Sequence, residues 1–193
     1  WQQLFEIGAL TEYFAPLHQV WSHAQYGQIR EIVQTALYFA GQMQLNLSQR
    51  LALLMASLNT DLFTLNSTET LSVNIEAAAK AINEIGNSAK VPKAQTQFAT
   101  LFVQQAQKLS RIDQLSAAEK IDLIQACSAH KAPDKLSQLL VTSHVLKLAI
   151  QHRQMVLALN SFHAISMDNI DQNLKGPAIG EALRQRRIEH LQT

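Results

Sequence analysis

Cysteine, proline and glycine are all scarce in this chain. Its 193 residues include one cysteine, Cys127, with four prolines and six glycines. A single cysteine excludes an internal disulfide framework and is typical of a protein kept in a reducing compartment. Few prolines and glycines leave little room for tight turns, which argues against a fold built from many short strands. No apolar run reaches about 18 residues and no signal peptide is evident, so we expect a cytoplasmic protein without a membrane span.

Apolar and helix-forming residues are abundant. Hydrophobic residues make up 47% of the sequence, enough for a sizeable core, and alanine, leucine, glutamine and lysine favour helices. We therefore predict an all-α fold. In the first part of the chain, apolar residues recur at helical spacing before Pro16 (one or two short helices), over 25–42, over 49–58 with Ser48 as N-cap, and from residues 66–68 to about Gly86. In the second part, helices are predicted over 93–108 and from a capping box at Ser116 to near His130. A last one is predicted from Asp134 to about Leu159, with a bend or break near Gln151. Residues 83–92 contain several turn formers and are the best candidate for an internal boundary.

Charge is distributed unevenly along the chain. Residues 1–89 carry three lysines and arginines against seven acids, a sum of −4, whereas residues 90–193 carry thirteen against eight, a sum of +5. Such asymmetry can mark a half that faces a polyanion, and it can also arise by chance.

The motifs of several enzyme classes are missing. The sequence has no Gly-Gly pair, no Asp-x-Asp and no P-loop, which are the usual means of holding nucleotide phosphates and magnesium. Asp168 and Asp171 are better explained as helix-capping residues. None of the seven histidines lies four residues from another, so no helical metal site is predicted. We predict no catalytic residue, no metal and no cofactor in this chain, and interpret it as not self-sufficient as an enzyme.

The last 20 residues hold the most informative segment. Gly176 and Pro177 start a helix whose N-terminus can meet an anion, and Gly180 allows a close approach to the first turn. Cations that could reach further phosphates follow within about two turns: Arg184, Arg186, Arg187 and His190. The alternative interpretation is a terminal amphipathic helix with solvated arginines and an inward apolar face made of Ile179, Leu183, Ile188 and Leu191.

Three segments of the chain carry a resemblance to a known family. They are LFEIGAL (4–10) followed by YFAP (13–16), VP (91–92) together with APDKLSQLL (132–140), and LKGPAIGEALR (174–184) followed by Arg187. In this order, and over nearly the whole chain, they resemble the C-terminal helical region of bacterial CCA-adding tRNA nucleotidyltransferases of the poly(A)-polymerase-like class. The terminal segment is the most specific of the three.

The chain departs from that family at the HD metal site. The His-Asp pair of an active HD domain would fall on Ala56 and Ser57, and the family's downstream His-His step on Gln105 and Ala106. The region expected to hold the upstream histidine, 28–32, has none, and the region of the late aspartate, 143–146, has no acid. Methyl groups cannot bind metal and a serine hydroxyl is a poor substitute for a carboxylate, so the phosphohydrolase activity should be lost.

The resemblance implies a multi-helix HD-domain-like bundle with a C-terminal helical tail. Its expected parts are connector helices over 1–24 from a nucleotidyltransferase head, a degenerate HD-like domain over 25–165 and a tail over 166–193. The head, which would use Mg and CTP or ATP, is expected upstream, because Trp1 is not a methionine and already lies in an amphipathic pattern.

The implied function is a tRNA-binding scaffold for that head. The expected RNA contacts are Lys175, Gly176, Arg184, Arg186, Arg187, Lys147 and Arg153, with Lys135 a weaker candidate. Alternatives are a poly(A)-polymerase-like helical region, a divergent metal-dependent phosphohydrolase and a helical protein-interaction module. Whether the parent forms a homodimer is open.

Overall fold

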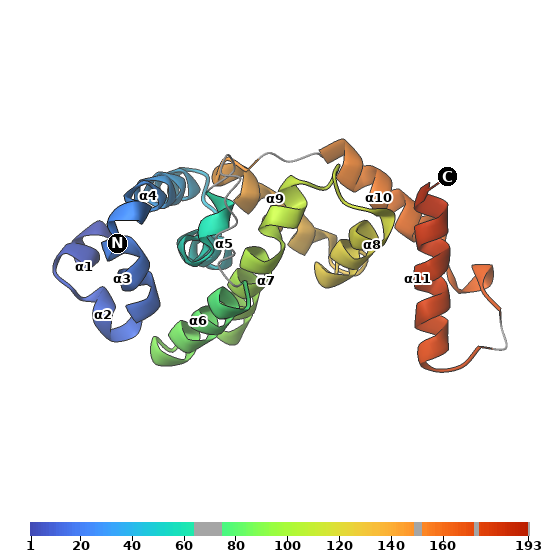
Figure 1. Cartoon of the computed structure of the whole chain (residues 1–193), viewed down its shortest axis with the longest axis horizontal. Helices are drawn as coiled ribbons and strands as arrows, with labels where there is room; N and C mark the ends of the chain where they lie inside the picture. Colours follow the sequence, from blue (N-terminus) through green and yellow to red (C-terminus); the bar gives the residue numbers. More distant parts are fainter. Residues whose placement is uncertain (64–74, 149–151, 172–173, 193) are drawn as a thin grey trace. The chain divides into compact units, whose positions relative to one another are not determined.

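The computed structural model describes residues 1–63, 75–148, 152–171 and 174–192. Over these residues the chain is an all-α multi-helix bundle, and no strand occurs among them, as predicted (Figure 1). Eleven α-helices are described: α1 (Gln2–Glu6), α2 (Leu10–Tyr13), α3 (Ala15–Ser22), α4 (Gly27–Gln42), α5 (Leu47–Met55), α6 (Ile75–Ser88), α7 (Lys93–Ser110), α8 (Ala117–Ala126), α9 (Pro133–Val145), α10 (His152–Ala164) and α11 (Pro177–Gln192). Four 3-10 turns accompany them: η1 (Ala24–Tyr26), η2 (Ala56–Leu58), η3 (Thr60–Leu62) and η4 (Met167–Asn169).

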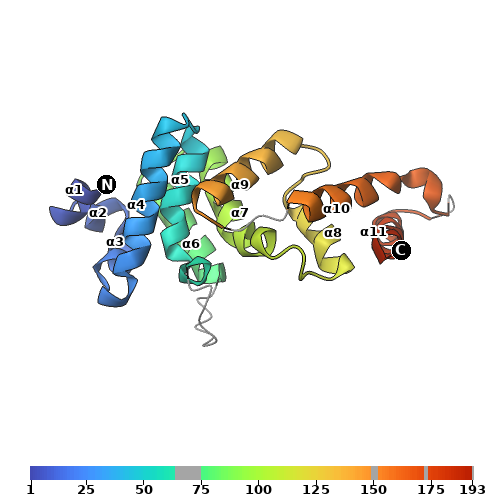
Figure 2. The same cartoon turned by 90° about the horizontal axis from the view of Figure 1, so that it is seen from above.

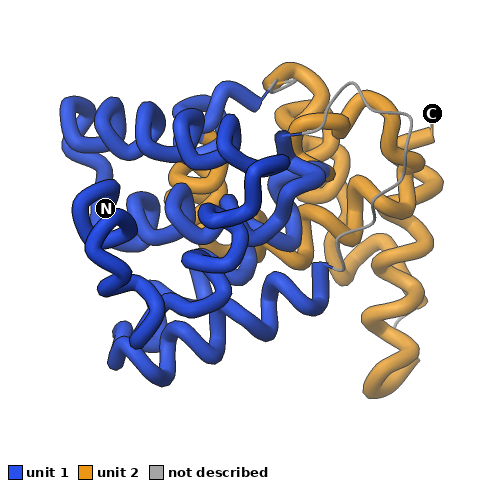
Figure 3. The backbone as a smooth tube through the Cα atoms, turned by 60° about the vertical axis from the view of Figure 1, so that its left-hand side comes forward, with its two compact units in different colours: residues 1–107, 141–148 blue, residues 108–140, 149–193 orange. Residues whose placement is uncertain are grey.

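Contacts between Cα atoms divide the chain into two units (Figure 3). Unit 1 comprises Trp1–Gln107 and Val141–Leu148, and unit 2 comprises Lys108–Leu140 and Ala149–Thr193. The segment limits implied by the family resemblance, at residues 24 and 165, stay a prediction.

Unit 1 is organised around α3, α4 and α5. The helices α4 and α5 lie side by side, and η2 packs on both of them and on α3 (Figure 2). Large apolar side chains with at most 2% exposure fill this core, including Leu17, Trp21, Val33, Leu53 and Met55. Two of these helices, α4 and α5, cover the segments 25–42 and 49–58 in which apolar residues recur at helical spacing.

Unit 2 contains three mutually packed helices. The helix α11 contacts both α8 and α10, which also contact each other. Their shared core includes Ile121, Ile124, Phe162 and Ile188. The C-terminal helix is consequently part of the packed body of unit 2 through one face.

Several predicted helix limits are corrected. Pro16 lies in the first turn of α3, where a missing N–H is tolerated, rather than at a helix end. The N-cap of α5 is Asn46 and not Ser48, since the Asn46 side chain accepts from Gln49 N at 3.0 Å. The capping box at Ser116 is confirmed, but α8 ends at Ala126, four residues before His130.

The helical segment predicted from Asp134, with a bend or break near Gln151, is two helices: α9 ends at Val145 and α10 begins at His152. Gln151 itself lies outside the described residues, and α10 continues past the expected end at Leu159 to Ala164. The helix start expected at 66–68 lies outside the described residues too. The expected boundary at 83–92 is mostly helix: α6 continues to Ser88, and Gly86 is buried against Thr96 of α7.

Candidate nucleic-acid interface

The start of α11 is open to solvent. Gly176 has φ +60°, a conformation that side chains with a Cβ rarely adopt, and Pro177 follows as the first helical residue. Lys175, Gly176, Pro177 and Gly180 are exposed, and a Cβ at either glycine would meet nothing within 4 Å. The first turn contains no acidic residue. Thus the positive end of the helix dipole and the Lys175 ammonium lie on an accessible surface.

Arg184 is half-buried and is paired with another residue of unit 2. Its Nε and Nη2 atoms donate to the two carboxylate oxygens of Asp122 on α8, at 2.8 and 3.0 Å. The hydrogen bond from Arg184 lowers the pKa of Asp122 below its ordinary value. Glu181 lies 3.9 Å from the same guanidinium. This bidentate ion pair links α11 to α8. The Arg184 guanidinium, which was expected to contact RNA, is thus already paired with a carboxylate.

Arg187 also faces the interior. Its guanidinium carbon lies 3.6 Å from the centre of the Phe162 ring, and its Nη2 donates to the Ile165 carbonyl at 3.2 Å. Burial lowers the pKa of the Arg187 guanidinium. A desolvated cation on an aromatic face is a stabilising contact between helices. Arg187 therefore ties α11 to the end of α10.

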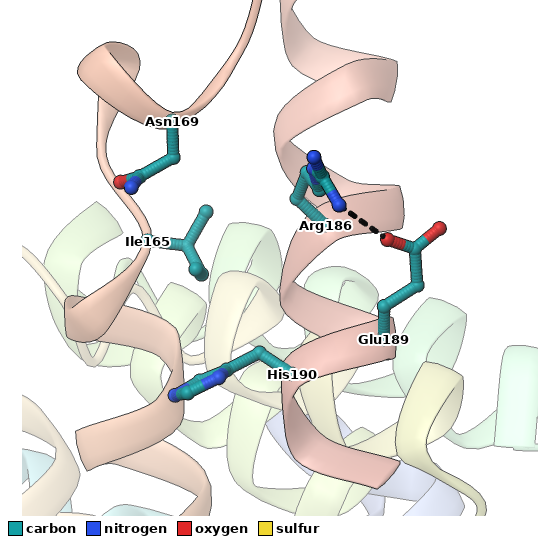
Figure 4. A pocket seen from close by; sticks show the side chains of 5 residues that line it. All are labelled: Ile165, Asn169, Arg186, Glu189 and His190. Carbon is teal, nitrogen blue, oxygen red and sulfur yellow. Dashed lines mark hydrogen bonds and ion pairs between the residues drawn. The ribbon is translucent and has the colours of Figure 1, made fainter. Parts of the chain in front are cut away.

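Arg186 is the exposed member of the arginine run. It forms an ion pair with Glu189, Nη1 to Oε2 at 3.2 Å, and both side chains are largely solvent-accessible. Beside it lies a hollow of about 300 Å³ lined by Ile165, Asn169, Arg186, Glu189 and His190 (Figure 4). In Figure 4 the Arg186 and His190 side chains border this space from α11. Exposed ion pairs are weak, so an incoming phosphate could displace Glu189 from Arg186.

The other expected cations are distributed over both units. Arg153 is exposed on α10 in unit 2, and Lys135 is on α9. Lys147 belongs to unit 1, follows α9 with φ +62° and lines a cavity of about 240 Å³ that also contains Glu31. The structure thus places Lys175, Arg186 and Arg153 on unit 2 as accessible cations, whereas Lys147 belongs to unit 1.

The partners of the arginines were not predicted from the sequence. Asp122, Phe162 and the Ile165 carbonyl come from segments far from α11 in the sequence. The available signal was the helical period: residues three apart share a face. Arg184 and Arg187 are three apart, and Arg187 is next to the buried Ile188.

The four positions that the resemblance assigns to HD ligands lie in unit 1, three of them in its core. Ala56, Ser57 and Ala106 have 0% exposure. The Trp21 indole N–H donates to Ser57 Oγ at 3.0 Å, and the Gln105 Oε1 atom is buried without a hydrogen-bond partner. In the described part of the chain, no group of three His, Cys, Asp or Glu side chains is arranged to hold a metal ion.

No protein-family model, curated protein or solved structure matches this chain. In the described ranges no helix combines the length and the apolar character that a membrane crossing requires.

Proposed function

We propose that this chain is a tRNA-binding scaffold of a CCA-adding tRNA nucleotidyltransferase, whose chemistry is carried out by an upstream head. The observation that supports it is the exposed, acid-free start of α11 with Lys175 beside it, followed along the same helix by Arg186 and the hollow that it borders with His190. Of the three segments that resemble the family, this one is the most specific.

The physical basis is phosphate recognition. Duplex RNA is recognised mostly through backbone shape and phosphate contacts, which suits a helix N-terminus and dispersed cations better than an aromatic platform. Unit 2 carries ten lysines and arginines and eight acids, a sum of +2, whereas unit 1 carries six and seven, a sum of −1. Unit 2 is therefore the unit better suited to bind RNA.

The contacts of each cation determine whether it stabilises the fold or is free to bind RNA. Arg184 and Arg187 stabilise the packing of α11, and Lys175 and Arg186 are the residues proposed to meet phosphates. Arg153 on α10 is a further candidate. Each phosphate contact is weak alone, and several together give strongly salt-dependent affinity.

The test is a titration of the chain with a full tRNA and with an acceptor minihelix at several salt concentrations. Lys175→Gln and Arg186→Gln should each weaken binding and reduce the salt slope by about 1. Glu189→Gln, which frees Arg186, should tighten binding. Lys80→Gln is the matched control, because Lys80 is an exposed cation of unit 1 that pairs with Glu84.

A flat response of affinity to salt would contradict the proposal. So would equal losses for Lys80→Gln and Arg186→Gln, since the effect would then reflect net charge alone. Circular dichroism on each variant separates loss of contact from loss of fold.

A second candidate function is a protein-interaction module. It is favoured by exposed apolar side chains on α4, directly after it and at the start of α5, with exposed fractions of 64% for Tyr38, 52% for Met43 and 66% for Leu47. Concentration-dependent association measured by analytical ultracentrifugation, abolished by Tyr38→Ser with Met43→Ser and accompanied by no salt-dependent tRNA binding, would favour this function.

A further inference from the structure

Unit 1 contains a cavity of about 540 Å³. This volume lies within the range of about 300–1,000 Å³ found for small-molecule sites. It is bounded by α1, the start of α3, α4, α5 and the α6–α7 connection. The lining side chains are mostly apolar: Trp1, Phe14, Leu37, Leu47, Leu51, Leu54, Ala89, Val91 and Pro92, with Arg50, Lys90 and Gln95 as the polar members.

The charge of the lining is of one sign. Arg50 and Lys90 are cations, and none of the twelve lining residues is acidic. The Nε atom of Arg50 is buried and has no hydrogen-bond partner. A buried donor without a partner is costly, and more so on a charged group. That atom is closed to solvent, so an anion in the cavity would pair with the positive charge of the guanidinium as a whole.

Lys90 is held beside the cavity by the backbone. It has φ +54°, and the next residue, Val91, donates its N–H to the Gly86 carbonyl at 2.9 Å. This closes the end of α6 and fixes the turn before α7. The second cation is thus attached to an ordered turn.

One end of the cavity is aromatic. Trp1 and Phe14 meet edge to face with ring centres 5.1 Å apart, and Trp1 remains 43% exposed. The other tryptophan, Trp21, is buried, with 2% exposure, and its indole N–H donates a hydrogen bond to Ser57. Trp1 is therefore the indole that reports on events in the cavity.

We propose that this cavity binds a small ligand with an apolar body and one carboxylate head group. The apolar walls take the body, and Arg50 takes the carboxylate through its guanidinium, with Lys90 contributing its charge as the second cation of the lining. This site is independent of the proposed RNA contacts, Lys175, Arg186 and Arg153, which all belong to unit 2.

The experiment compares octanoate with 1-octanol, which share an apolar chain and differ in charge. Calorimetry and Trp1 fluorescence are measured on the whole chain. Octanoate should bind with a dissociation constant of about 1 mM or lower, as expected for a ligand of this size. It should bind about 10-fold more tightly than 1-octanol, because a hydrogen bond to a charged group is the difference between them.

Variants assign the head-group contact. Arg50→Leu should remove the preference for octanoate, and it should leave thermal stability unchanged or higher because Nε has no partner to lose. Lys90→Asn, which tolerates positive φ, should weaken octanoate several-fold and keep the fold. Lys93→Gln is the matched control for net charge, since Lys93 is exposed at the start of α7 and does not line the cavity.

Three outcomes would overturn the proposal. The first is no octanoate binding at about 10 mM, well above the expected dissociation constant. The second is equal affinity for the two ligands. The third is a preference for octanoate that survives both Arg50→Leu and Lys90→Asn, or that Lys93→Gln removes equally.

Discussion

Gly86 is a position where one added methyl group should destabilise the protein. A Cβ built on Gly86 would lie 2.7 Å from both Cγ2 and Oγ1 of Thr96 and 3.3 Å from its Cβ. Thr96 is buried, with 7% exposure, and β-branched side chains in helices have little rotamer freedom. The neighbour cannot easily move away, so Gly86→Ala forces α6 and α7 apart.

The magnitude is a balance of two terms. Overpacking a well-packed site costs about 1–3 kcal/mol. Replacing glycine by alanine inside a helix returns about 1 kcal/mol through reduced backbone entropy. The expected net loss from Gly86→Ala is therefore about 1 kcal/mol, which for a chain of this length lowers the Tm by about 2–4 °C.

The assay is thermal unfolding followed by circular dichroism, with a double-mutant cycle. In the Thr96→Ala background, where Cγ2 and Oγ1 are gone, Gly86→Ala should be neutral or stabilising. Gly41→Ala is the matched control, because Gly41 also lies in a helix and a Cβ there would meet nothing within 4 Å. If Gly86→Ala raised the Tm as much as Gly41→Ala does, the close approach of α6 and α7 would be refuted.

Three further predictions concern single contacts. Cys127 is buried and its pKa is raised to about 11 by burial, so Ellman's reagent at pH 8 should react slowly with the native protein and rapidly after unfolding. The hydrogen bond from Arg184 lowers the pKa of Asp122 in the folded protein. The stability that this carboxylate contributes is therefore present above its ordinary pKa of 3.8 and is lost as the pH falls through the folded pKa. Asp122→Asn should remove that part of the acid sensitivity in pH-dependent melting curves. Ser57→Ala leaves the buried Trp21 N–H unpaired and should cost about 1–3 kcal/mol in urea unfolding, whereas Ser57→Ala added to Trp21→Phe should cost less.

Local signals in the sequence were sufficient for much of the fold. The capping box at Ser116 was visible because its Ser and Glu119 are three residues apart, and both hydrogen bonds form, at 2.8 and 3.3 Å. The apolar period located α4, α7 and most of α5. Helix starts and faces depend on neighbours in sequence, which explains their predictability.

Helix ends and the long-range partners of side chains were harder to predict from the sequence. Asn46 outcompeted Ser48 as the N-cap of α5 because Gln49 three residues later completes a capping box with Asn46. The close packing of Gly86 on Thr96, across the turn at Pro92, turned a supposed domain boundary into a tight helix pair. In a sequence, glycine is usually interpreted as a sign of a turn or linker, but Gly86 instead allows α6 and α7 to approach each other closely.

The arginine run at the C-terminus shows where a pattern of charges needs the helical period to be interpreted. Successive residues of an α-helix are rotated by about 100°. Arg184 and Arg187 therefore share one face, which packs on α8 and α10, whereas Arg186 lies on the opposite face.

The expected basic surface of this segment accordingly divides into two sets of residues. Arg184 and Arg187 bind groups within unit 2 and position α11, and through it the exposed turn that begins at Gly176. The cations left for a phosphate backbone are those on the other face and before the helix, Arg186 and Lys175. If the chain binds tRNA, Arg184 and Arg187 contribute by holding that helix in place rather than by contact.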